Sequence, residues 1–187
     1  MALTFANKIT VCRILAVPFF IATVLYYSPQ KDYLRFTALG IFLFAVVSDV
    51  IDGYVARRHH QKTKAGAILD PLADKLLLMS AFICLYKIGV GFEAVRFPIW
   101  FVVGVISRDV ILLLGAMIIH LFSGDLTIEP TLLGKATAFF QVLSILGVLL
   151  QWPFSSAVWY PTLFLAAVSG VDYIRKGIKM INNGELA

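Results

Sequence analysis

The feature that most constrains this chain is a series of long apolar runs, each separated from the next by a short polar or helix-ending break. A membrane-spanning helix needs about 20 predominantly apolar residues, and each run has about this length. Only 14% of the residues are charged, against roughly a quarter in soluble domains. The sequence therefore predicts an all-α, polytopic membrane protein with about six transmembrane helices, formed by a single domain over residues 1–187. The predicted spans are 8–27, 33–57, 66–88, 98–122, 132–151 and 157–176.

The distribution of Lys and Arg predicts the orientation, because cytoplasmic loops collect these residues during insertion. If the N-terminus is cytoplasmic, ten of them fall on that side and four on the other. The ten are Lys8, Arg13, Arg57, Arg58, Lys62, Lys64, Lys135, Arg175, Lys176 and Lys179, and the four are Lys31, Arg35, Lys87 and Arg96. We expect both termini in the cytoplasm and the protein in the cell (inner) membrane. The basic residues flank spans without forming one face with interleaved aromatics, so no nucleic-acid partner is expected.

Four aspartates lie where the second predicted span ends and the third begins. Ionisable groups in spans cost about 2.5–3.5 kcal/mol each on insertion scales and usually mark function. Asp49 and Asp52 are three residues apart, so they share one helix face; Asp70 and Asp74, four apart, share another. Crowded carboxylates need raised pKa values or a cation, and an all-oxygen site suits a hard divalent ion such as Mg²⁺. Such a site, with one or two ions, would hold a pyrophosphate and stabilise charge on the transferring and leaving oxygens.

Two other interpretations of the acidic cluster were weighed. The aspartates could belong to a structural ion network with Arg57, Arg58, Lys64 and Lys75, although such a network does not require so regular a spacing. They could also line a cation pathway through a membrane transporter. A transporter would need polar residues that continue to the far side of the membrane, and the acidic cluster is confined to one end. The pattern therefore favours an enzyme.

Residues 49–74 read AspValIleAspGlyTyrValAlaArg, then eight residues, then GlyAlaIleLeuAspProLeuAlaAsp. This segment resembles the signature of the CDP-alcohol phosphotransferase (CDP-alcohol phosphatidyltransferase) family, D-x-x-D-G-x-x-A-R-x8-G-x-x-x-D-x-x-x-D, at every specified position. The resemblance extends to the six-span layout. It implies a homodimeric membrane enzyme of phospholipid synthesis, which transfers a phosphate-linked alcohol from a CDP-activated donor to a hydroxyl acceptor.

The resemblance also implies roles for the residues of the signature. Asp49, Asp52 and Asp70 would ligate the divalent ions, Mg²⁺ or Mn²⁺, that bridge the donor pyrophosphate. Asp74 would be a ligand of the second ion and the general base that deprotonates the acceptor hydroxyl. The residues expected at the donor CDP group are Asp49, Asp52, Gly53, Ala56, Arg57 and Gly66. Among them the small residues allow close approach, and the guanidinium of Arg57 suits a diphosphate.

The segment AsnLysIleThrValCysArg at residues 7–13 resembles the opening of family members that use CDP-diacylglycerol. The resemblance places Asn7 and Thr10 at the donor and Arg13 on the acceptor side, on a shared helix face that borders the cleft. The alternative is that Asn7 and Thr10 cap a helix while Arg13 snorkels toward the membrane surface.

Two further basic residues are candidates for the acceptor phosphate. Arg108 lies next to Asp109 in the middle of the fourth predicted span, and Lys135 lies near the start of the fifth. Both could bind an acceptor phosphate, with Gln141 in the same cluster. Alternatively, Arg108 pairs with Asp109 or another carboxylate so that neither charge is buried alone.

Two acceptors are the main candidates, and the acceptors of phosphatidylserine or phosphatidylinositol phosphate synthesis, or another one, stay open beside them. Family members of this size most commonly use glycerol-3-phosphate, as phosphatidylglycerolphosphate synthases do, and this acceptor is favoured. Those enzymes usually have ArgGlu where this chain has Arg108 and Asp109, with a second Arg one to two turns later that is missing here. SerArgAspVal at 107–110 and the segment 130–137 instead resemble cardiolipin synthases of the CDP-alcohol type, whose acceptor is phosphatidylglycerol.

Overall fold

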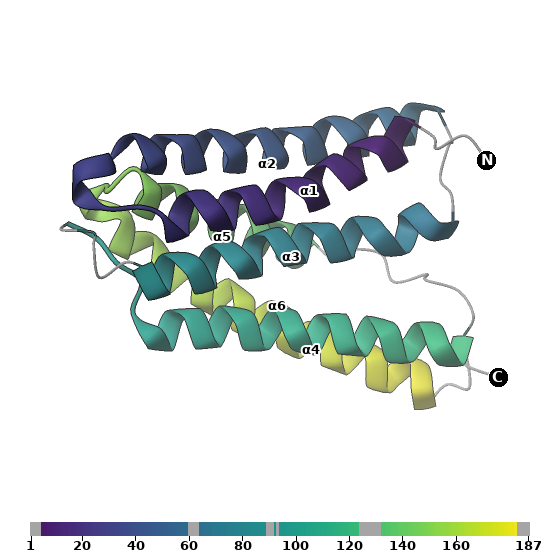
Figure 1. The fold of residues 1–187 in the computed structure, drawn as a ribbon. Coiled ribbons are helices and arrows are strands. Elements are labelled where there is room, and N and C mark those ends of the chain that lie inside the picture. Colours follow the sequence, from purple (N-terminus) through teal and green to yellow (C-terminus); the bar gives the residue numbers. More distant parts are fainter. Residues whose placement is uncertain (1–4, 60–63, 89–91, 93, 124–131, 183–187) are drawn as a thin grey trace. The chain divides into compact units, whose positions relative to one another are not determined.

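The computed structural model is built from six α-helices, with no strand among the residues that it describes (Figure 1). The described residues are 5–59, 64–88, 92, 94–123 and 132–182, with side chains described in 12–50, 73–87, 92, 94–115, 117 and 132–176. The helices are α1 (Phe5–Leu25), α2 (Tyr33–His59), α3 (Lys64–Ile88), α4 (Ile99–Ser123), α5 (Leu132–Leu149) and α6 (Ser156–Asn182), with 3-10 turns η1 (Pro29–Lys31) and η3 (Pro153–Ser155). The all-α prediction is confirmed, and each predicted span corresponds to one helix.

Three stretches are long and apolar enough to cross a membrane, among the residues that could be searched: Tyr33–Val50, Leu132–Leu149 and Pro153–Lys176. A shorter apolar stretch covers Cys12–Leu25. Large apolar side chains lie exposed along several helices, including Phe19, Phe44, Phe139 and Phe164. Lipid chains can cover such surfaces, so the helices suit a bilayer better than water.

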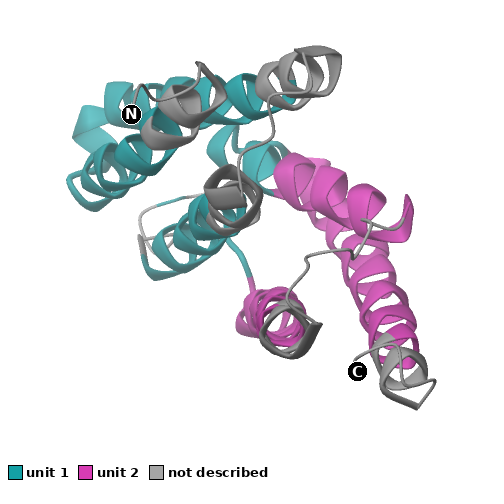
Figure 2. Cartoon of the chain, turned by 90° about the vertical axis from the view of Figure 1, so that its right-hand side faces the viewer, with its two compact units in different colours: residues 1–97, 145–152 teal, residues 98–144, 153–187 magenta. Residues whose placement is uncertain are grey.

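The chain divides into two compact units, coloured separately in Figure 2. Unit 1 comprises residues 1–97 and 145–152, and unit 2 comprises residues 98–144 and 153–187. Helix α5 contributes to both units.

In unit 1, α1 packs against both α2 and α3 (Figure 1). Phe20 of α1 and Phe42 of α2 are fully buried, with ring centroids 6.0 Å apart. Helices α1 and α3 run in one direction and α2 in the other. The N-terminal ends of α1 and α3 therefore lie on the same side as the C-terminal end of α2, which carries the first half of the aspartate signature.

In unit 2, α4 and α6 lie side by side and run parallel (Figure 1). Near their N-terminal ends, Phe101 stacks on Trp159 with ring centroids 5.8 Å apart. Further along, Gly115 faces the ring of Tyr173 so closely that an added Cβ would lie 2.7 Å from Cε1. Small residues let membrane helices approach in this way.

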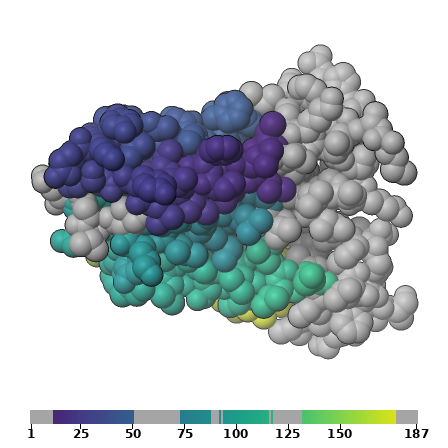
Figure 3. Space-filling view, in the orientation of Figure 1, coloured from purple at the N-terminus to yellow at the C-terminus, as the bar shows by residue number. Residues whose placement is uncertain are grey.

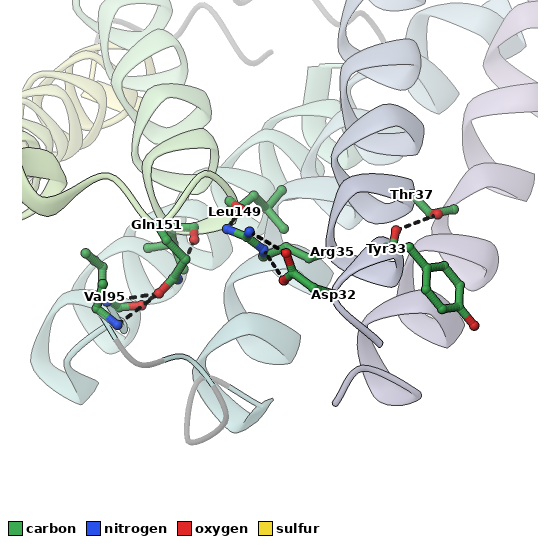
Figure 4. A network of polar contacts seen from close by, with 9 residues as sticks. Asp32, Tyr33, Arg35, Thr37, Val95, Leu149 and Gln151 are labelled. Carbon is green, nitrogen blue, oxygen red and sulfur yellow. Dashed lines mark hydrogen bonds and ion pairs between the residues drawn. The ribbon is translucent and has the colours of Figure 1, made fainter. Parts of the chain in front are cut away.

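The end of α5 is shaped by Gln151, whose φ of 53° lies in the left-handed region. The Gln151 amide donates to the Val148 carbonyl at 3.0 Å, and the next amide donates to the Gly147 carbonyl at 2.9 Å. This is a Schellman ending, with glutamine where glycine is usual. The Gln151 side chain also donates to the Val95 carbonyl and accepts from its amide (Figure 4). The side chain thereby ties the segment before α4 to the end of α5.

A second polar contact lies beside it in unit 1, around Arg35 (Figure 4). Arg35 donates to both carboxylate oxygens of Asp32, from Nε at 2.7 Å and from Nη2 at 2.8 Å. Its Nη1 donates to the Leu149 carbonyl at 3.1 Å and so caps the C-terminal end of α5.

Candidate active site

The four signature aspartates lie on two helices that share α1 as a neighbour. Asp49 and Asp52 belong to the second half of α2, and Asp70 and Asp74 to the first half of α3. In Figure 3 the purple surface of α1 lies between the blue of α2 and the teal of α3. The structure places Asn7 and Thr10 on α1, Gly53, Ala56 and Arg57 on α2, and Gly66 on α3. The side chains of these residues, and of Asp52 and Asp70, lie outside the described ones.

Asp49 forms an ion pair with Arg13 of α1. Nη1 of Arg13 lies 2.6 Å from Oδ1 of Asp49, as a close charge contact in which the N–H groups are not well aimed at the oxygen. The Arg13 side chain is only 1% exposed, whereas that of Asp49 is 43% exposed. Arg13 therefore does not extend to the membrane surface, as the snorkelling alternative requires. It is a buried cation beside an accessible carboxylate.

The two signature aspartates with described side chains, Asp49 and Asp74, are suitable ligands for a divalent ion. Asp49 and Asp74 are both partly exposed, and carboxylate oxygens are the ligands that Mg²⁺ and Mn²⁺ prefer. No group of three His, Cys, Asp or Glu side chains comes together within the described part of the chain. A complete ligand set would have to include Asp52 and Asp70.

Arg108 lies in unit 2, within a buried polar network that joins three helices. Its Nη1 donates to Oδ1 of the adjacent Asp109 at 2.7 Å, and its Nη2 donates to Oγ of Ser169 in α6 at 2.6 Å. Gln141 of α5 donates from Nε2 to Oδ2 of Asp109 at 3.1 Å. Arg108 and Asp109 are thus paired, which was one of the two alternatives for Arg108. Gln141 lies in this network, while its place beside an acceptor phosphate stays a prediction.

Lys135 lies near the start of α5, and its side chain is exposed. Its amine is therefore accessible to the phosphate of a soluble molecule or of a lipid headgroup. Nearby Thr137 is buried, and its hydroxyl donates to the Leu133 carbonyl of its own helix at 2.8 Å. Sequence reasoning missed Ser169, because nothing in the sequence connects this serine of α6 to Arg108.

The model that describes the CDP-alcohol phosphatidyltransferase family matches residues 3–171. The chain belongs to the CDP-alcohol phosphatidyltransferase family. The matched region spans α1 to α5 and most of α6, so it includes the signature aspartates and the Arg108 network. The family predicted from residues 49–74 is therefore confirmed.

Proteins named for either of the two candidate activities resemble this chain. A CDP-diacylglycerol–glycerol-3-phosphate 3-phosphatidyltransferase of Aquifex aeolicus is 33% identical over 183 residues, which cover 94% of this chain and 96% of the relative. The enzyme of the same name from Bacillus subtilis is 29% identical over 189 residues, covering 91% and 93%. A probable cardiolipin synthase (CMP-forming) of Drosophila melanogaster is 30% identical over 195 residues, covering 92% of this chain and 57% of the relative.

Proposed function

We propose that this chain is a membrane enzyme of phospholipid synthesis that transfers a phosphatidyl group from CDP-diacylglycerol to glycerol-3-phosphate and releases CMP. The observation that carries the proposal is similarity over nearly the full length to bacterial enzymes named for this reaction. The intact aspartate signature on two helices that share one neighbour supports the same activity.

In this proposal Asp49, Asp52, Asp70 and Asp74 hold Mg²⁺ or Mn²⁺, as two ions. When bound, the ions supply positive charge that offsets the negative charge of the diphosphate and of the leaving CMP. The donor CDP group would be bound by Asn7, Thr10, Asp49, Asp52, Gly53, Ala56, Arg57 and Gly66.

The chemical step is a direct displacement at phosphorus. Asp74 takes the proton from the acceptor hydroxyl, and the oxygen attacks the phosphorus that carries the diacylglycerol. A new P–O bond forms as the bond from this phosphorus to the oxygen of CMP breaks. Arg57 binds the phosphate that leaves with CMP, and no covalent intermediate with the enzyme is needed.

The acceptor side is assigned to Arg108, Lys135 and Arg13. The exposed amine of Lys135 would meet the acceptor phosphate first, and a guanidinium is well shaped to bind a phosphate.

The proposed enzyme spans the cell (inner) membrane six times as a single domain over residues 1–187, with both termini and the active site on the cytoplasmic side. The ten-to-four distribution of Lys and Arg supports this orientation. A lipid donor could keep its acyl chains in the bilayer while the CDP group enters from the cytoplasm. A homodimer is proposed by analogy with the family.

The second candidate is a cardiolipin synthase that uses phosphatidylglycerol as acceptor. The SerArgAspVal sequence at 107–110 favours it, as does the similarity to the Drosophila melanogaster protein of that name.

The deciding experiment measures CMP release by the detergent-purified protein with CDP-diacylglycerol and Mg²⁺, with glycerol-3-phosphate or phosphatidylglycerol as the only added acceptor. We expect release with glycerol-3-phosphate, and none with Asp74→Asn or with EDTA. Release with phosphatidylglycerol alone would establish the second candidate. No release with either acceptor would contradict both.

A further inference from the structure

The polar network around Arg108 is almost wholly buried within unit 2. The residues Arg108, Asp109, Gln141 and Ser169 are 7%, 1%, 0% and 3% exposed. A charged pair at this depth is tolerated because each charge compensates the other and their hydrogen bonds are formed inside the protein. The network therefore has little freedom to rearrange.

The network fixes the guanidinium of Arg108 from two helices. Asp109 binds Nη1 and Ser169 binds Nη2, while Gln141 holds the other oxygen of Asp109. The stem of Arg108 passes beside Gly170, where an added Cβ would lie 3.7 Å from Cγ. The hydrogen bond to Ser169 fixes the orientation of the guanidinium plane, and the hydrogen bond from Gln141 fixes the carboxylate of Asp109.

Two buried polar atoms of the network have no hydrogen-bond partner among the described residues: Nε of Arg108 and Oε1 of Gln141. Buried polar atoms without a partner are rare, and each calls for an explanation. A bound ligand with an anionic group would satisfy the Nε–H of Arg108, because Nε is the one nitrogen of this guanidinium that makes no hydrogen bond to the described residues. An arginine whose other nitrogens are held in place presents that donor in one direction only.

We propose that Gln141 and Ser169 are positioning residues for the acceptor: Gln141 through Asp109, and Ser169 directly, orient the Arg108 guanidinium so that its Nε–H binds the acceptor phosphate. The inference rests on the proposed function, in which Arg108 belongs to the acceptor side. Neither residue touches the reacting atoms, so their loss changes acceptor recognition and leaves donor binding intact.

The test compares Gln141→Leu and Ser169→Ala with Ser144→Ala as the matched control. Ser144 lies on α5 one turn from Gln141, is buried, and donates to the Phe140 carbonyl at 2.8 Å, but it contacts Thr162 instead of Arg108. The measured quantities are kcat, the KM for glycerol-3-phosphate, the KM for CDP-diacylglycerol, and the Tm in detergent.

We expect Gln141→Leu and Ser169→Ala to raise the acceptor KM about tenfold and to change the donor KM less than about twofold. Ser144→Ala should change neither KM, and Ser169→Thr, which keeps the hydroxyl, should restore the acceptor KM. In an Arg108→Ala background, Gln141→Leu should add nothing, because both act through one group.

Three outcomes would overturn the inference: equal rises in both KM values, an unchanged acceptor KM, or a rise with Ser144→Ala as large as with Gln141→Leu. If Gln141→Leu does not fold, the KM values of Ser169→Ala test the inference alone. This variant removes only one hydroxyl and is therefore expected to fold. A wild type that uses phosphatidylglycerol instead changes the acceptor in the assay, and the same KM comparison then applies. A wild type inactive with both acceptors would overturn the proposed function and this inference together, whereas an active wild type with unchanged KM values overturns the inference alone.

Discussion

Two arginine–aspartate pairs of nearly the same length differ in how far their carboxylates are open to solvent. Arg13 and Asp49 approach to 2.6 Å in unit 1, and Arg108 and Asp109 approach to 2.7 Å in unit 2. Both guanidiniums are buried. The carboxylate of Asp49 is nevertheless 43% exposed, whereas that of Asp109 is only 1% exposed.

The difference indicates which member of each pair serves a ligand. In the closed pair, the carboxylate of Asp109 binds Arg108 and Gln141 and is buried, so it cannot meet a ligand. Arg108 is therefore the member of this pair that is oriented to bind one. In the open pair the arginine is the buried member, and Asp49 stays accessible at the end where the signature lies. A third pair, Asp32 with Arg35, lies in unit 1 around the capped end of α5 and has a carboxylate that is 46% exposed.

The largest expected effect on stability comes from opening the closed pair. Asp109→Asn keeps the size of the side chain but leaves Arg108 as an uncompensated buried charge, which should cost about 3–5 kcal/mol of unfolding free energy. Denaturant unfolding in detergent measures it. The double variant Arg108→Met, Asp109→Leu should recover most of the loss, because no buried charge remains. A loss under about 1 kcal/mol for Asp109→Asn would mean that water reaches this pair and that it is not closed.

The open pair should respond mainly in activity. Asp49→Asn removes a carboxylate proposed to hold the divalent ions, so kcat should fall about 100- to 1000-fold, as when one electrostatic contact to a transition state is lost. Asp49→Asn should lower the unfolding free energy less than Asp109→Asn does. Asp49 is partly exposed, so water can replace its carboxylate beside Arg13. CMP release and unfolding are compared on the same preparation. Arg13→Gln changes the other member of the pair, which is assigned to the acceptor side, so it should reduce kcat less than Asp49→Asn does and should raise the acceptor KM. The reverse order of the two kcat losses would make Arg13 the member that supports the chemical step.

Much of the fold could be predicted because it follows from local patterns. The apolar runs are interrupted by Pro, Gly and charged residues, and each run became one helix. The Arg108–Asp109 pair was foreseen as an alternative because the two residues are neighbours in the sequence. The aspartate signature could be recognised because its residues lie within two adjacent helices.

The contacts that escaped prediction depend on how helices pack, which a single sequence does not encode locally. Arg13 was expected on the acceptor side or at the membrane surface, and its approach to Asp49 requires the packing of α1 on α2. Ser169 lies 61 residues from Arg108. Gln151 ends α5 in a conformation that glycine usually adopts, so the residue type gave no signal. The metal site stays a prediction, because two of its four aspartates lack described side chains.

The close contact between α4 and α6 in unit 2 should tolerate added side-chain volume less well than the exposed surface of α2 in unit 1. Gly115→Ala places a Cβ 2.7 Å from Cε1 of Tyr173, so the rigid ring or the α4–α6 spacing must shift, at about 1–3 kcal/mol. Gly40→Ala in α2 is the control, because an added Cβ meets nothing within 4 Å there. Unfolding in detergent should show a loss for Gly115→Ala only. Equal stability of the two variants would show that α4 and α6 can separate freely, and the network between them could not then fix Arg108.

The exposed pair Asp32–Arg35 should have the smallest effect, and the effect should depend on pH. The hydrogen bonds from Arg35, partly offset by desolvation, lower the pKa of Asp32 below its ordinary value of 3.8. The folded state therefore favours the ionised carboxylate, so the pair stabilises the protein fully above the unfolded pKa and loses this contribution as the pH falls through the lowered folded pKa. Tm values at about pH 6 should be slightly higher for the wild type than for Asp32→Asn, and the difference should shrink as the pH falls through the lowered pKa of Asp32. Parallel Tm curves at every pH would mean that water screens this pair completely.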